Sequence, residues 1–185
     1  MVAIWLTLLA IVHSQYRLMK HASIIDFWLL AFPFAIHCGW ITAASALNIN
    51  VLVIDKGGTA AVQLAVAIVS LAGLHAASVW VLFGLTRPIY TVATVVAWAS
   101  WWIFQELKSP KELIVNTFAL EVIQGVSYAA ATVAVIVLTQ IAIRVFVAAM
   151  QLLKHNDEDA TIAHTIDSSM NGNQQESHEN DCHAA

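Results

Sequence analysis

The sequence feature that most constrains the fold is an uncharged, strongly apolar run from Thr59 to Leu85. An α-helix rises about 1.5 Å per residue, so this run is long enough to cross a hydrocarbon core of about 30 Å. Gly57 and Gly58 precede the run, and Arg87 and Pro88 follow it, as is typical of the loops that end a helix. We therefore predict a membrane-spanning helix from Thr59 to Leu85.

The composition extends this prediction to most of the chain. Of the 185 residues, 59% are hydrophobic and 11% are charged, whereas an average soluble domain has roughly 45–50% and about 25%. We predict an all-α fold, a polytopic membrane helical bundle of about five transmembrane helices. The other four helices are expected in Met1–Val12, in the part of Ile24–Ile54 after Pro33, in Pro88–Phe104 and in Val122–Ile143.

Two of these stretches have unusual lengths. Met1–Val12 gives roughly 18 Å of helix at about 1.5 Å per residue, which is short for a span. Ile24–Ile54 is too long for one straight span and too short for two. Because proline interrupts helices, we expect Pro33 to separate an interfacial lead-in from the span itself. A second interfacial segment is expected at Leu113–Leu120, before the last span.

The acidic charge is concentrated at the C-terminal end. Seven of the twelve carboxylates lie between Asp157 and Asp181, among Asn, Ser, Gln and His residues. Such a composition buries too little apolar surface to offset the entropy of ordering. We predict a transmembrane bundle over residues 1–154 and a disordered acidic tail over residues 155–185, which the positive-inside rule places in the cytoplasm. The basic residues are scattered singly, so we expect no nucleic-acid partner.

Small residues at four-residue spacing predict where the helices pack. Gly73 with Ala77, and Gly125 with Ala129, have the small-xxx-small spacing that allows close helix contact in lipid. We expect a compact bundle built on these contacts.

Polar side chains at bilayer depth must find partners inside the bundle or in a cavity. Helical spacing predicts a shared polar face for His37, Ser45 and Asn48, with Trp40 beside it. His75 and Ser78 lie one turn apart, and a further stripe consists of Glu121, Gln124, Tyr128 and Thr132. These residues are candidates for ligand contact or proton transfer. The alternative is that they only hydrogen-bond to neighbouring helices.

Seven tryptophans are a clear excess for a chain of this length. Trp98, Trp101 and Trp102 are so close in sequence that at least one must face inward or sideways on a helix with 3.6 residues per turn. Indole rings offer a flat apolar surface with one N–H donor, which suits planar ligands. The alternative is an aromatic belt that faces lipid.

Motifs of common enzyme classes do not occur in the sequence. There is no nucleophile elbow, phosphate-binding glycine loop, CxxC pair, HExxH motif or catalytic carboxylate pair. We therefore predict that the protein is not an enzyme, and we predict no metal site and no obligatory cofactor.

Two segments carry a resemblance to a known family. The run HAASVWVLFGLTRPIYTVATVVAW contains Trp80, Phe83, Gly84, Pro88 and Ala93, and PFAIHCGWITAASALNINVL extends over residues 33–52. Together they resemble, in divergent form, the tryptophan-rich sensory protein and translocator protein (TspO/MBR-related) family. The resemblance implies a five-helix bundle, often a homodimer, that binds tetrapyrroles or sterol-like lipids in an aromatic-lined pocket. It carries over Trp80, and more loosely Trp40 and Trp98, as pocket residues.

The combined hypothesis is an integral, multi-pass membrane protein of the binding or sensory type. It holds a planar apolar molecule, with haem or another porphyrin as candidate ligand, in an aromatic-lined pocket inside the bundle. One alternative is a small proton-coupled transporter with a relay of His37, His75 and Glu121; another is a scaffold subunit without a ligand. The predicted ligand-binding residues are Trp40, Trp80, Trp98, Trp101, Trp102, His37, Asn48 and His75.

Overall fold

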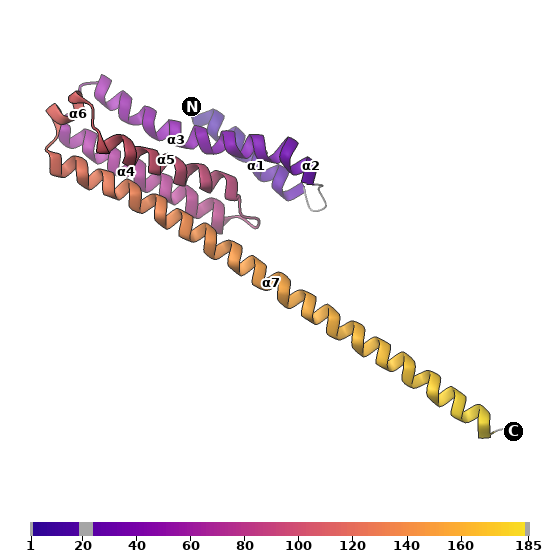
Figure 1. Ribbon diagram of the computed structural model, residues 1–185. Coiled ribbons are helices and arrows are strands. Elements are labelled where there is room, and N and C mark those ends of the chain that lie inside the picture. The colour runs from indigo at the N-terminus through magenta and orange to yellow at the C-terminus, as the bar shows by residue number, and fades with distance from the viewer. Residues whose placement is uncertain (1, 19–23, 184–185) are drawn as a thin grey trace. The chain divides into compact units, whose positions relative to one another are not determined.

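The computed structural model describes the backbone of residues 2–18 and 24–183, and side chains within residues 4–14 and 25–156 (Figure 1). In these ranges every regular element is a helix, as predicted. The long helices are α1 (Val2–Leu18), α3 (Phe32–Asp55), α4 (Ala60–Val79), α5 (Tyr90–Lys108) and α7 (Leu120–His183). The short elements are α2 (Ile24–Asp26), α6 (Glu112–Thr117) and two π-helical segments, η1 (Phe27–Ala31) and η2 (Trp80–Gly84).

Helices that can cross a membrane are present, which confirms a membrane helical bundle. In the described part of the chain, three helices are long and apolar enough: Phe27–Asp55, Ala60–Gly84 and Leu120–Asn156. Helix α1 has only 17 residues, so it stays short, as the sequence suggested. Helix α5 is close to the lower limit of length and carries Glu106 and Lys108 in its last turn. Helices α1 and α5 are therefore the other two of the five long helices, but they are not among those long and apolar enough to cross a membrane.

Pro33 does not divide the second apolar stretch, contrary to our expectation. Residues Phe27–Ala31 form a π-helical segment, and the Phe32 N–H donates to the Phe27 carbonyl. Pro33 lies in the first turn of α3, where a missing N–H costs little. The helix therefore continues through the proline as one long segment from Phe27 to Asp55.

The connection from α3 to α4 is a tight turn. Gly57 has a φ of 69°, a conformation in which a glycine avoids the steric strain of a side chain. Thr59 then caps α4, because its hydroxyl accepts a hydrogen bond from the Val62 N–H at 3.4 Å. The observed helical segment Ala60–Gly84 confirms the predicted span. The next helix begins at Tyr90, two residues after the predicted Pro88.

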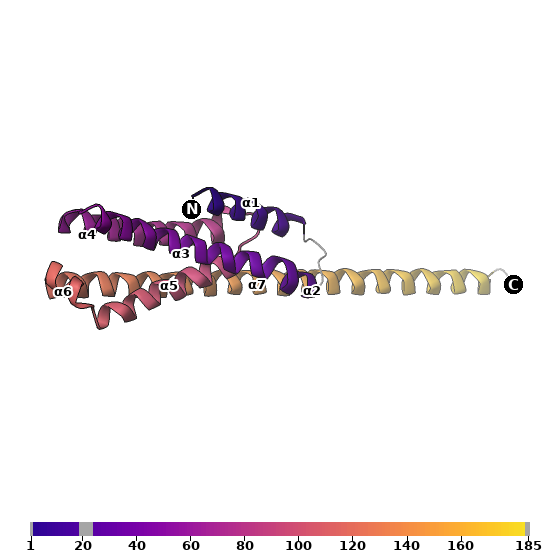
Figure 2. The same ribbon diagram turned by 90° about the horizontal axis from the view of Figure 1, so that it is seen from above.

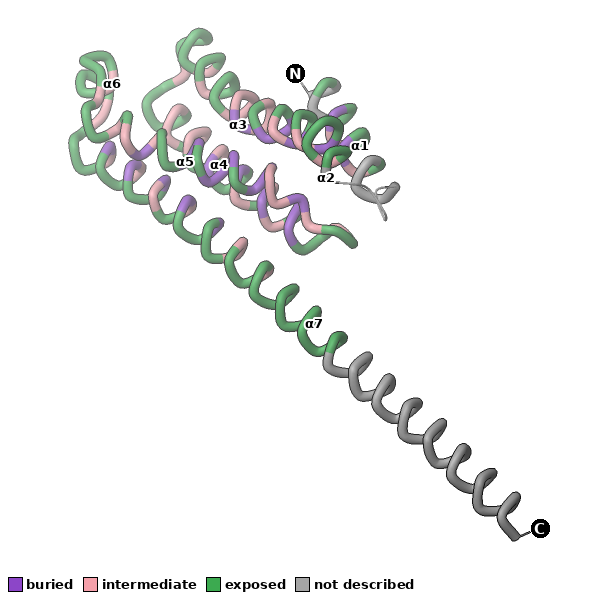
Figure 3. Tube along the Cα trace, turned by 45° about the vertical axis from the view of Figure 1, so that its right-hand side comes forward, coloured by how far each residue is buried: buried purple, intermediate pink, exposed green. Residues whose placement is uncertain are grey.

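Helix α3 occupies a central position in the compact unit, residues 1–142. It contacts α1, α4 and α5, and Figure 2 shows α1 lying along it. The core joins buried side chains from α1, α3, η2, α5 and the first part of α7, and Figure 3 shows these buried stretches. The largest fully buried members are Val12, Leu82, Ile89, Val92 and Val137. A smaller cluster consists of Leu71, Phe104 and Ala130.

The predicted small-residue contacts are not where the helices meet. A Cβ atom added to Gly73 or Gly125 would have no described atom within 4 Å, so neither glycine packs against a neighbouring helix in the described chain. The close approach occurs at Gly39 instead, where an added Cβ would lie 2.7 Å from the Cβ of Val95. The four-residue spacing predicted close packing at Gly73 and Gly125, whereas the close packing occurs at Gly39.

Helix α7 extends into the segment for which composition predicts a disordered acidic tail. Composition favours disorder beyond His155, whereas the backbone of α7 is helical as far as His183. The segment Ile143–Ala185 forms a compact unit of its own. The division at residue 154 stays a prediction.

Candidate functional site: an apolar groove between α3 and α4

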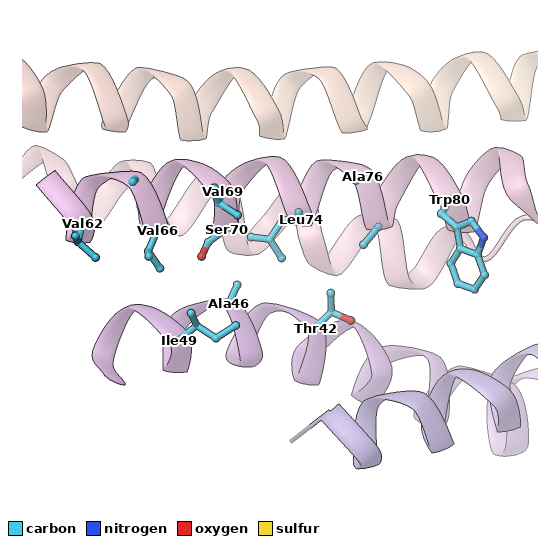
Figure 4. A pocket seen from close by; sticks show the side chains of 13 residues that line it. Thr42, Ala46, Ile49, Val62, Val66, Val69, Ser70, Leu74, Ala76 and Trp80 are labelled. Atoms are coloured by element: carbon cyan, nitrogen blue, oxygen red, sulfur yellow. The ribbon is translucent and has the colours of Figure 1, made fainter. Parts of the chain in front are cut away.

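A groove of about 680 Å³ lies between α3 and α4. The two helices run antiparallel, and Figure 4 shows side chains from both facing one another across the open space. This volume lies within the range of roughly 300–1,000 Å³ that is typical of small-molecule sites. The groove is lined by Thr42, Ala46, Ile49, Val62, Ala65, Val66, Val69, Ser70, Gly73, Leu74, Ala76, Ala77 and Trp80.

Small residues on α4 create the space. Gly73, Ala76 and Ala77 line the groove, and the open surroundings of Gly73 show that no side chain of α3 fills the gap. Larger aliphatic residues, among them Ile49 of α3 and Val62 and Val66 of α4, also line the groove. The same glycine and alanine that suggested a packing contact in the sequence therefore form a wall of the groove.

The groove has few polar groups, and those it has are engaged within the protein. The Thr42 hydroxyl donates to the Cys38 carbonyl at 2.8 Å. The Ser70 hydroxyl accepts from the Asn50 amide at 2.9 Å, which ties α3 to α4. With these hydroxyls used in helix contacts, the remaining lining is hydrocarbon. An apolar ligand could enter the groove without breaking a strong interaction with water.

Trp80 provides an aromatic surface at one end of the groove, where its indole is 43% exposed (Figure 4). Its position depends on Gly84, because a Cβ atom at that residue would lie 2.7 Å from the indole Cδ1. The π-helical turn Trp80–Gly84 thus holds the ring against a residue that has no side chain. This is a physical reason for the tryptophan and the glycine to occur together in this segment.

The other predicted tryptophans lie on a different surface. Trp40 of α3 packs edge-on against Trp98 of α5, with ring centroids 5.0 Å apart, and Trp98 packs against Trp102 at 5.7 Å. We call these three residues the tryptophan ladder. Each is about half exposed, and none lines the groove. Trp101 instead packs against Phe104 at 5.1 Å.

The predicted polar ligand-binding residues are not brought together in the groove. His37 and Asn48 of α3 are exposed, and neither lines it. His75 of α4 is partly buried, and its Nδ1 atom has no hydrogen-bond partner among the described residues. The Asn50–Ser70 bond sets the register of the antiparallel pair, so His75 is level with Ser45 along the helix axes. His37 is eight residues farther along α3, about 12 Å away at 1.5 Å per residue.

The stripe expected on the last span faces out of the bundle. Glu121, Gln124, Tyr128 and Thr132 are all exposed, whereas Ile123, Ser127 and Ala130 form the buried face of α7. The Ser127 hydroxyl donates to the Phe104 carbonyl at 3.3 Å across the helix interface. The relay residues His37, His75 and Glu121 therefore occur in three separate environments.

The residues that line the groove can be compared with the contacts that a porphyrin requires. A metal-free ring needs a flat apolar surface, which Trp80 and the aliphatic lining provide. An iron-bearing ring also needs an axial ligand such as imidazole or thiolate. The described residues that line the groove include no histidine, cysteine or methionine. The lining therefore fits the ring system and not axial ligation of its metal.

Sequence reasoning missed most of the groove lining. Thr42, Val66 and Ser70 belong to ordinary apolar helix sequences and carry no motif of their own. The available signal was the set of small residues on α4. Small residues can indicate a close helix contact, but they can equally indicate a hollow in the helix surface.

The fold and the groove together define an integral helical membrane protein with an apolar intramembrane hollow. Residues 1–143 match the family described as TSPO-like protein, and the chain belongs to that family. The match confirms the resemblance drawn from the two tryptophan-bearing segments, and it ends one residue after the compact unit. At the level of the family, this is a membrane sensory or binding protein. No curated protein and no solved structure matches the chain.

Proposed function

We propose that this TSPO-like protein binds a planar, apolar small molecule of the tetrapyrrole or sterol-like class in the α3–α4 groove. The observation that carries the proposal is a hollow of about 680 Å³ with a hydrocarbon lining and one indole, Trp80, at its end. Stacking on Trp80 and burial against the aliphatic residues would supply the affinity. Binding a metal-free ring is favoured over binding haem, because the groove lining lacks an axial ligand.

The position of the groove also suggests how such a ligand arrives. The groove is open rather than enclosed, and both of its helices are long and apolar enough to span a membrane. A ligand dissolved in the bilayer can therefore reach it by lateral diffusion, without passing through water. This route suits molecules that are poorly soluble in water.

The test is a titration of the purified protein in nanodiscs with metal-free protoporphyrin and, separately, with a fluorescent sterol. Tryptophan quenching by the porphyrin reports binding. In Trp80→Ala the loss of stacking and contact area should weaken the Kd by about ten-fold or more. Trp101→Ala is the matched control, because Trp101 packs against Phe104 and is not part of the groove. Equal loss in both variants, or saturable binding that Trp80→Ala leaves unchanged, would contradict the proposal.

One observation supports the carrier alternative. The Nδ1 atom of His75 is buried without a partner among the described residues, so one ring nitrogen has an unused hydrogen-bonding capacity inside a membrane-spanning segment. His37 and Glu121, the other proposed relay groups, are exposed. A carrier would therefore depend on His75 alone. Proton-driven uptake into liposomes that is lost in His75→Gln and retained in His37→Gln would support this alternative.

A further inference from the structure

A second hollow lies at the end of the bundle where α3 meets α4. It has a volume of about 290 Å³ and is bounded by the end of α3, the start of α4, the end of α5, helix α6 and the start of α7. We call it the terminal cavity. Its residues are separate from those of the α3–α4 groove. The Asn50–Ser70 hydrogen bond joins one lining residue of each space, so it forms part of the partition between them.

The size and lining of the terminal cavity suit a narrow, apolar occupant. Its volume is just below the range of roughly 300–1,000 Å³ that holds drug-sized ligands. Leu64, Leu107, Ile114 and Val126 are among the hydrocarbon side chains that line it. A single hydrocarbon chain matches this combination, whereas a fused ring system would need more room.

The polar side chains of the terminal cavity donate hydrogen bonds to other groups of the protein. The Asn50 amide N–H groups donate to the Ala46 carbonyl at 2.8 Å and to the Ser70 hydroxyl at 2.9 Å. The Gln63 amide donates to the Gly58 carbonyl at 2.7 Å. The Thr117 hydroxyl donates to the carbonyl one turn earlier, at 2.8 Å. Both N–H groups of Asn50 and one of the two on Gln63 are engaged in this way, so the amide oxygens are the main polar groups that the lining offers to a ligand.

The level of the cavity in the membrane follows from charges beside it. Lys111 pairs with Glu106 at 3.3 Å, and Lys108 lies over the Phe104 ring at 4.5 Å from its centroid. These charged residues connect α5 to α6, which places this end of the bundle at the lipid headgroups. An amphiphile would therefore present its polar end near Asn50 and Gln63 and its chain to the apolar wall.

From these observations we propose that the terminal cavity is a second ligand site, specific for a single hydrocarbon chain that ends in a hydroxyl group. The hydroxyl donates its one proton to one of the two amide oxygens that line the cavity, that of Asn50 or that of Gln63. A carboxylate or an ether cannot do so, because neither carries a hydrogen-bond donor. The site does not depend on whether the α3–α4 groove binds a planar ligand.

Photolabelling of the full-length protein in nanodiscs tests the proposal, with a diazirine-bearing dodecanol as the probe. Labelled residues should fall in the segments 50–67 and 113–126. Excess dodecanol should displace the probe. Dodecyl methyl ether and dodecanoate should displace it about ten-fold less well, since neither can donate a hydrogen bond to an amide oxygen of the lining. Equal displacement by the ether, stronger displacement by dodecanoate, or labelling that cannot be saturated would overturn the proposal.

Two variants locate the site. Ala67→Phe fills the cavity and should abolish specific labelling, whereas Ala61→Phe, at an exposed position outside the cavity, should leave it unchanged. Gln63→Leu removes an acceptor and should reduce the preference of the alcohol over its methyl ether, even if Ala67→Phe does not fold. Protoporphyrin titration of the same variants is the parallel readout, which separates failure of this site from failure of the groove. Specific labelling that persists in folded Ala67→Phe would rule the terminal cavity out.

Discussion

Helix α3 meets two neighbours in different ways. Toward α5 the contact is closed, because Gly39 allows Val95 to approach and Trp40 packs against Trp98. Toward α4 the contact is open, because Gly73 and its neighbouring alanines leave a hollow that no side chain of α3 fills. In lipid there is no hydrophobic force to close such a gap, since lipid tails are as apolar as the side chains. Small residues thus produce a close helix contact where the opposite helix complements them and an open groove where it does not.

The largest effect is expected from a substitution that disrupts the close contact between α3 and α5. In Gly39→Ala the new Cβ would lie 2.7 Å from the Cβ of Val95, an atom that cannot move without the backbone. Overpacking of this kind costs about 1–3 kcal/mol of stability. Thermal unfolding in detergent should therefore occur at a clearly lower temperature. Val95→Gly in the same chain removes that Cβ atom and should restore part of the loss. Unchanged stability of the single variant would show that α3 and α5 are not in close contact.

The open groove can be closed by a side chain of suitable size. In Ala76→Phe the ring should occupy the groove, so that protoporphyrin binds at least about ten-fold more weakly while thermal stability stays near that of the natural protein. The control is Ala72→Phe, an exposed position on the same helix that does not line the groove. If porphyrin binding is equally strong in both variants, the ligand does not use the groove.

A smaller effect is expected at the tryptophan ladder. Trp98→Ala removes both of its aromatic contacts, and such pairs contribute about 0.5–1.5 kcal/mol each. We expect a modest loss of thermal stability and an unchanged affinity for protoporphyrin. A large loss of porphyrin affinity, with stability retained, would show that the planar ligand binds at the tryptophan ladder and not in the groove.

The smallest effect is expected at Gly125. A side chain there would meet no described atom within 4 Å, so Gly125→Ala should change stability by less than about 1 kcal/mol, with helix propensity favouring alanine. The measurement is thermal unfolding combined with size-exclusion chromatography and light scattering. A change in the number of subunits would instead assign this face to the homodimer that the family resemblance implies.

The main helices could be predicted from the sequence because their signals are local. Thr59–Leu85 was identified by its length and lack of charge, and its helix begins after the Thr59 cap and includes the π-helical turn. Pro33 was misjudged, because whether a proline breaks a helix depends on the hydrogen bonds around it, here those of the preceding π-helical segment. Trp80 was assigned to a pocket through a family pattern, and it does line the groove.

The sequence alone determined that the chain forms helices in a bilayer, since apolar length and internal backbone hydrogen bonding depend only on neighbouring residues. The tertiary structure decided which way each side chain faces. Trp80 and Trp98 are equally aromatic, and Gly39 and Gly73 equally small, yet one member of each pair lies in a packed contact and the other lines the groove. The reason is that the rotation of a helix about its axis is fixed by contacts with residues distant in sequence, which no local pattern contains.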